Sequence, residues 1–200
     1  MFEFICSSIV YFNNASVWNM EKNLLLATCI LTLGILGCQK KDPIIPNEEE
    51  VISAIVFTLT PEKGGETKII SVNYLGGNTP VYRSDTLEAH TTYYASVQFL
   101  NEFVSPVTDI TEEVQDEAND HQIFYQSNLN DLLLLYDDAD TNGFPVGLKS
   151  KLITGKSSSG ELSIILRHLP EKAAEGVKLG NITNAGGETD VEINFLIYVQ

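Results

Sequence analysis

The chain has 200 residues and a formal net charge of −15, from 12 basic and 27 acidic side chains. This acidic excess repels nucleic acid and anionic lipid, so it argues against a nucleic-acid-binding function. The three cysteines, Cys6, Cys29 and Cys38, all lie in the N-terminal part of the sequence. No disulfide can therefore form within residues 39–200, and the sequence has no CxxC or Cys/His metal-binding pattern.

Residues 24–37 form an uncharged, mostly apolar run that is shorter than the ~20 residues of a membrane span. Its length fits the apolar part of a secretory signal, which follows a short basic segment. That segment would be residues 20–23, with the single Lys22. We therefore expect Met20 to be the true start, with residues 1–19 a mis-assigned start or an extended n-region, and residues 20–37 to be the signal peptide.

The apolar run ends at Gly37-Cys38, which resembles the cleavage site of a bacterial lipoprotein signal. This resemblance implies that Cys38 carries a covalent lipid, including palmitate, and becomes the new N-terminus. A plain signal peptide and a buried helix with a chance cysteine are the alternatives. Residues 38–50 are polar and contain two prolines, as expected of a tether. The acyl chains would attach the protein to the outer membrane, at its periplasmic face or at the cell surface.

Residues 51–200 are expected to form one domain, since apolar side chains recur at every second position. The pattern is clearest in "YYASVQFL" (93–100), "ELSIILRHL" (161–169) and "DVEINFLIYV" (190–199). Further strands are expected at 54–60, 67–75, 121–126, 131–136 and 147–154. Glycine-rich turns separate these segments, so we predict an all-β fold, an antiparallel two-sheet sandwich of about eight strands. It would be Ig-like or jelly-roll-like, with a closed barrel as the alternative.

One short surface helix is expected in "DITEEVQDEAND" (109–120), where Asp109 or Thr111 could cap the N-terminus. The N-terminal signal segment is expected to be helical or disordered.

The segment "DDADTNGFP" (137–145) raises a metal-binding hypothesis. Asp138, Asp140 and Asn142 occupy alternate positions before Gly143, as in the first half of an EF-hand loop that binds calcium. The twelfth position of that loop is Lys149, where a bidentate glutamate is required. The alternative is a hairpin loop in which Asn142-Gly143 makes the turn and the aspartates face water.

Histidines and aromatic residues give two further hypotheses. His121 and His168 each lie at the end of an expected strand and could bind haem or a transition metal, although no pair of histidines has ligand spacing. Six aromatic residues could line a sugar- or ligand-binding face or build the core: Tyr82, Tyr93, Tyr94, Phe124, Tyr125 and Tyr136. Because the sequence contains no nucleophile motif and no distinct acid/base pair, we expect a protein that is not an enzyme.

Five segments together resemble a family of small Bacteroidota lipoproteins: "NEEEVISAIVFTLTP", "DITEEVQDEANDHQIFYQ", "DDADTNGFPVGL", "LSIILRHLPEKAAEGV" and "NAGGETDVEINFLIYVQ". Some members carry the label "type 1 periplasmic binding fold", which describes two α/β lobes, whereas the period of two here predicts strands. The resemblance implies a membrane anchor and one domain, and it carries no activity. The sequence thus predicts an outer-membrane or surface lipoprotein that acts as a binding or structural module, with an unknown protein or glycan ligand. The calcium-stabilised adhesion or glycan-binding module and the haem- or metal-binding lipoprotein are the alternatives.

Overall fold

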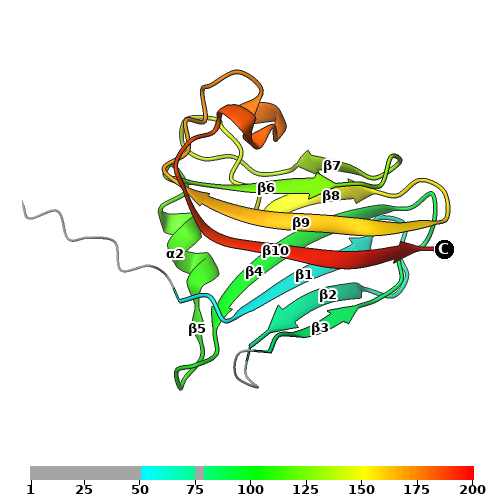
Figure 1. Cartoon of the computed structure of the whole chain (residues 1–200). Coiled ribbons are helices and arrows are strands. Elements are labelled where there is room, and N and C mark those ends of the chain that lie inside the picture. The colour runs from blue at the N-terminus through cyan, green and yellow to red at the C-terminus, as the bar shows by residue number, and fades with distance from the viewer. Residues whose placement is uncertain (1–50, 75–78) are drawn as a thin grey trace, which may run out of the picture. The chain divides into compact units, whose positions relative to one another are not determined.

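The computed structural model describes residues 51–74 and 79–200, which belong to a unit spanning Asn47–Gln200. In these residues the chain forms two antiparallel β-sheets and one short α-helix (Figure 1). The predicted signal peptide, the tether and Cys38 lie outside the described residues. Within the described residues, no helix is long and apolar enough to cross a membrane.

The larger sheet contains seven strands. Six of them follow the order β3-β2-β1-β4-β8-β7, and β5 pairs with β4. Their bounds are β1 Ala54–Pro61, β2 Lys68–Asn73, β3 Val81–Ser84, β4 Thr92–Asn101, β5 Thr108–Asp109, β7 Leu133–Tyr136 and β8 Lys149–Ile153. The smaller sheet has the order β10-β9-β6, with β6 His121–Ser127, β9 Ser158–His168 and β10 Glu188–Val199. The predicted two-sheet antiparallel sandwich is confirmed.

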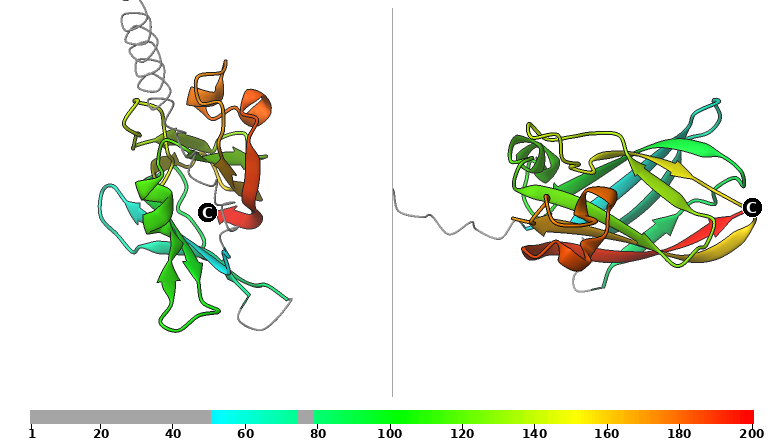
Figure 2. Two further views of the ribbon diagram at one scale, coloured as in Figure 1. Left: turned by 90° about the vertical axis from the view of Figure 1, so that its left-hand side faces the viewer. Right: turned by 90° about the horizontal axis from the view of Figure 1, so that it is seen from above.

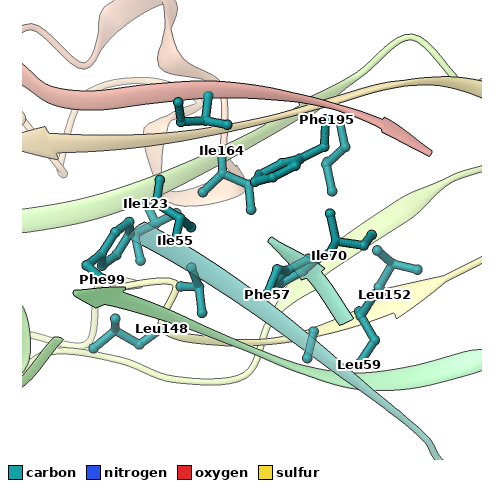
Figure 3. Packing of buried hydrophobic residues seen from close by; sticks show 14 of the residues in the cluster. Ile55, Phe57, Leu59, Ile70, Phe99, Ile123, Leu148, Leu152, Ile164 and Phe195 are labelled. Carbon is teal, nitrogen blue, oxygen red and sulfur yellow. The ribbon is translucent and has the colours of Figure 1, made fainter. Parts of the chain in front are cut away.

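The core lies between the two sheets and follows from the alternation of side chains along each strand. On β4, Tyr93, Ala95, Val97 and Phe99 are buried, whereas Tyr94 is 46% exposed. Figure 3 shows residues of both sheets meeting in this layer, with Ile55, Phe57 and Leu59 from β1 and Ile164 and Phe195 from the smaller sheet. Burial of these apolar side chains is the main force that holds the sheets together.

Helix α2, Ile110–Asp116, connects β5 to β6 and begins at the predicted cap. The Asp109 side chain accepts a hydrogen bond from the Thr111 backbone N–H at 3.0 Å, which satisfies one of the free donors at the helix start. Ile110 and Val114 on this helix are buried in the main core. The helix is therefore more than the surface crossover that its sequence predicts, because its apolar side packs against the hydrophobic layer.

The segment between β9 and β10 covers the outer face of the smaller sheet. It contains two short 3-10 helices, η1 Val177–Leu179 and η2 Ile182–Asn184 (Figure 2). Val177 and Ala185 from this segment pack with Phe124 of β6 and Ile165 of β9 in a second apolar cluster. Both faces of the smaller sheet are thus covered, which explains why β6 is buried at four consecutive positions.

Candidate functional site

A groove of about 710 Å³ lies between helix α2 and the outer face of the larger sheet; we call it the α2 groove. Its floor comes from three adjacent strands, with Thr58 on β1, Ser96 and Gln98 on β4, and Lys149 at the start of β8. Ser96 lies directly opposite Thr58 on one side and Lys149 on the other. Rigid, paired strands thus hold these polar side chains side by side.

The wall of the α2 groove is acidic. Glu112 and Asp116 from α2, together with Asp109 at its cap, face the floor residues along with Gln115. Carboxylate, amide and hydroxyl groups are all strong hydrogen-bonding partners for a polar ligand. The floor residues can be predicted from the sequence, because they are the polar positions of strands in which polar and apolar residues alternate. The position of the wall cannot, since it depends on where α2 packs.

Tyr94 lies on the same face of β4 as Ser96 and Gln98, because its position has the same parity. Its hydroxyl donates a hydrogen bond to Glu62 Oε1 at 3.1 Å, and the Lys151 ammonium lies 5.0 Å from the ring centre. These contacts fix the orientation of an exposed aromatic ring next to the floor of the α2 groove.

The other five aromatic residues of the sugar-face hypothesis lie elsewhere. Tyr93 and Phe124 are buried in the core, and Tyr82 on β3 is half exposed. Tyr125 and Tyr136 are partly buried, and their hydroxyls donate to the backbone carbonyls of Gly147 and Ile123. Burial raises the pKa of Tyr136 to about 12, so its hydroxyl stays protonated as a donor. Of the six residues, Tyr94 alone adjoins the α2 groove.

The loop that contains Asp138, Asp140 and Asn142 turns its carboxylates toward donors of the protein itself. Asp138 accepts from the backbone N–H groups of Gly147 and Lys149, at 2.7 and 2.8 Å. Asp140 Oδ1 accepts from the N–H groups of Asn142 and Phe144, at 2.8 and 2.9 Å.

Gly143 makes the turn with a φ of +80°, as the hairpin alternative predicts. That alternative also predicts that the aspartates face water, which is wrong for Asp140, a residue only 9% exposed.

Lys172 occupies the place where a cation would neutralise Asp140. Its ammonium lies 2.9 Å from Asp140 Oδ2 and also donates to the backbone carbonyls of Ala118 and Pro145. Burial opposes ionisation of Asp140, but the hydrogen bonds from Lys172 and from the loop backbone outweigh it and lower the pKa of Asp140. The calcium hypothesis stays a prediction, and these contacts require that Ca²⁺ displace the Lys172 ammonium before it can use Asp140.

His121 and His168 are brought together, although 46 residues separate them in the sequence. They lie directly opposite each other on β6 and β9, and their rings are stacked with centres 4.8 Å apart. Glu117, which follows α2, completes a group whose donor atoms all lie within 4.8 Å of one another. We call Glu117, His121 and His168 the His-Glu cluster. Glu117 is absent from the sequence-based hypothesis, because it follows α2 whereas His121 begins β6, and no local pattern places the two side chains together.

His121 is fully buried within this cluster. Its Nδ1 lies 3.2 Å from the carbonyl oxygen of Glu117, and its Nε2 lies 3.7 Å from Asp190 Oδ2 on β10. Burial lowers the pKa of His121, so the ring is neutral at pH 7. If Nδ1 carries the proton and donates it to the carbonyl, Nε2 presents a lone pair.

Comparison of the chain with protein-family models, with curated proteins and with solved structures returned no match in any of the three.

Proposed function

We propose that the protein is a lipid-anchored outer-membrane protein whose β-sandwich is a non-catalytic module that binds a glycan in the α2 groove. The observation that carries this proposal is the set of polar side chains that line the groove beside the apolar Val97 and Leu148. Hydroxyl and amide groups on adjacent strands form the floor, and carboxylates on α2 form the wall. The ligand hydroxyls of a sugar can donate to Glu112 and Asp116 and exchange hydrogen bonds with Ser96 and Gln98.

Tyr94 supports a sugar over other polar ligands. An aromatic face beside hydrogen-bonding groups suits a sugar ring, which has apolar C–H faces and polar edges. The side chain is 46% exposed and held by Glu62 and Lys151, so little entropy is lost when a ligand packs on it. The negative wall also favours neutral or cationic sugars over acidic ones.

The binding experiment screens the full chain against an array of neutral and amino-sugar oligosaccharides and then measures the best ligand by calorimetry. Gln98→Ala and Glu112→Gln are expected to weaken binding, since each hydrogen bond to a ligand contributes about 1 kcal/mol, or roughly fivefold in affinity. Glu192→Gln is the matched control, because Glu192 is exposed on the smaller sheet outside the lining of the α2 groove. An array without a ligand, or equal affinity in all four proteins, would refute the glycan proposal.

The anchor has its own test. Cells that express the full chain are given a labelled fatty acid, and the Cys38→Ala variant is expected to lose the label and leave the membrane fraction. Several acyl chains on one residue anchor a protein stably, at about 0.8 kcal/mol for each buried methylene group. Cys29→Ala is the matched control, since it removes a thiol from the same stretch of sequence and should label normally. Normal labelling of Cys38→Ala would disprove the anchor.

A further inference from the structure

We propose that the His-Glu cluster is a binding site for one divalent transition metal ion of the zinc class. Three features of the described residues support this: the strand pairing that places the two imidazoles together, the buried His121 Nε2 that makes no hydrogen bond, and the exposed Glu117 carboxylate beside them. None of its three residues lines the α2 groove, so its test does not depend on glycan binding.

The fold positions the three side chains independently of any ion. His121 is the first residue of β6 and His168 the last of β9, and antiparallel pairing sets them face to face. By the alternation of each strand, His121 shares its side with Ile123, and His168 shares its side with Leu166, and both apolar residues belong to the core. The imidazoles therefore lie at the end of the layer between the two sheets, where Glu117 at the end of α2 approaches them.

The ring of His121 is arranged as metal-binding histidines commonly are. One ring nitrogen contacts a backbone carbonyl, which fixes the tautomer and the ring orientation. The other, Nε2, is buried and has no hydrogen-bond partner within the described part of the chain. A buried polar atom without a partner is costly, and coordination of a cation would remove that cost.

Coordination requires a modest closure of the cluster. Ligand atoms about 2.0–2.2 Å from a tetrahedral ion are roughly 3.3–3.6 Å apart, whereas the present separations reach 4.8 Å. The Glu117 carboxylate lies 3.9 Å from His121 Nδ1, so it must swing toward the Nε2 side of the ring, which its 52% exposed side chain allows. His168 is partly exposed and can also move toward the buried His121. The His168 ring must turn out of the stack, because an ion lies in the plane of each imidazole that binds it.

The donor set selects the kind of ion. Two imidazoles and a carboxylate suit Zn²⁺, Co²⁺, Ni²⁺ or Cu²⁺, whereas Mg²⁺ and Ca²⁺ prefer oxygen ligands alone. Asp190 Oδ2, 3.7 Å from His121 Nε2, is close to the separation of two ligands that share one ion and could supply a fourth. The stacked rings favour a single ion over haem, since a porphyrin has no space between them.

The test uses the full chain in detergent and adds Co²⁺, whose visible absorption reports tetrahedral coordination, and Zn²⁺ in calorimetry. An excess of Mg²⁺ is present throughout, so that the many surface carboxylates do not compete for the transition metal. The expected result is one Zn²⁺ per chain and a visible Co²⁺ spectrum that Zn²⁺ abolishes.

Two variants assign the site. His168→Ala and Glu117→Gln each remove one ligand from a partly exposed position, and each is expected to lower Zn²⁺ affinity at least about tenfold. The control is His90→Asn, because His90 is exposed and lies near Gly155, before the start of β9, whereas His168 ends that strand. Asparagine tolerates the positive φ of 56° at this position. No Zn²⁺ binding, or an equal loss of affinity in His90→Asn, would overturn the proposal.

Discussion

Lys172 offers the sharpest test of what holds the described domain together. Its ammonium joins its own segment to two others, since it donates to Ala118 after α2 and to both Asp140 and Pro145 in the loop before β8. The change Lys172→Met keeps an unbranched apolar chain of similar length and removes the charge and all three hydrogen bonds. It thus isolates the ammonium from the packing of the stem.

The size of the effect follows from burial. The Lys172 and Asp140 side chains are 5% and 0% exposed, so the variant leaves an ionised carboxylate in a dry site without its countercharge. Removing one partner of a buried pair costs about 3–5 kcal/mol. For a domain of this size such a loss lowers the melting temperature by roughly 6–20 °C, at about 2–4 °C per kcal/mol. The two backbone N–H donors that remain on Asp140 Oδ1 place the expected value toward the lower end.

Urea unfolding at pH 7 measures the loss directly as a change in midpoint at constant slope. Lys178→Met is the matched control, because Lys178 is exposed on η1 and its loss should change stability by no more than about 0.5 kcal/mol. Adding Asp140→Asn to Lys172→Met should restore part of the stability, since a neutral amide is less costly to bury than a carboxylate. If Lys172→Met unfolds at the same urea concentration as Lys178→Met, the buried pair does not stabilise the domain and the reasoning fails.

Three further predictions follow from the same loop. The unmodified protein should be more stable to unfolding than Asp140→Asn at pH 7. This difference should shrink below the unfolded-state pKa of about 3.9 and vanish once the pH falls below the lowered folded-state pKa of Asp140. Urea titrations at several pH values measure the difference, and a difference that is constant with pH would contradict the prediction. Gly147→Ala should destabilise the protein by about 1–3 kcal/mol, because a Cβ there meets Ile123 at 2.9 Å and the residue has a φ of +94°. Gly143→Ala should cost only about 1 kcal/mol, since a Cβ there meets open space and only the φ of +80° is unfavourable. Equal urea midpoints for the two variants would count against this prediction. If Ca²⁺ uses Asp140, its stabilising effect in thermal melts should be larger in Lys172→Met than in the unmodified protein, and no calcium effect in either would end the calcium hypothesis.

The sequence predicts most of the fold because the strands carry a strong local signal. All eight expected strands are present, and the inward faces of β4, β9 and β10 are the apolar faces that the alternation indicates. Two strands of the structure, β3 and β5, are not predicted from the sequence. β3, Val81–Ser84, has no buried residue, and β5 is only two residues long, so neither shows an apolar alternation.

In the loop that contains Asp140 and Gly143, the sequence predicts the turn but not the contact with Lys172. The turn at Gly143 follows from the tolerance of glycine for positive φ, and the sequence indicates it correctly. The partner of Asp140 does not follow, since Lys172 is 32 residues away in a segment whose residues 171 and 173 are exposed. A lysine in such surroundings is expected at the surface, and it is buried because the fold supplies one carboxylate and two carbonyls around its ammonium.

For His121 and His168, the sequence predicts the side of the sheet but not their contact, on which the candidate metal site depends. Parity alone places His121 on the inward side with Ile123, and His168 on the inward side with Leu166, so the alternation predicts the side of the sheet on which each ring lies. Their contact is not predicted, because it depends on β6 pairing with β9 and on the register of that pair. A slip of one residue would turn one of the two rings to the opposite face of the sheet and separate them. The candidate metal site is thus a product of strand register, which many apolar contacts of the core determine together and no single motif encodes.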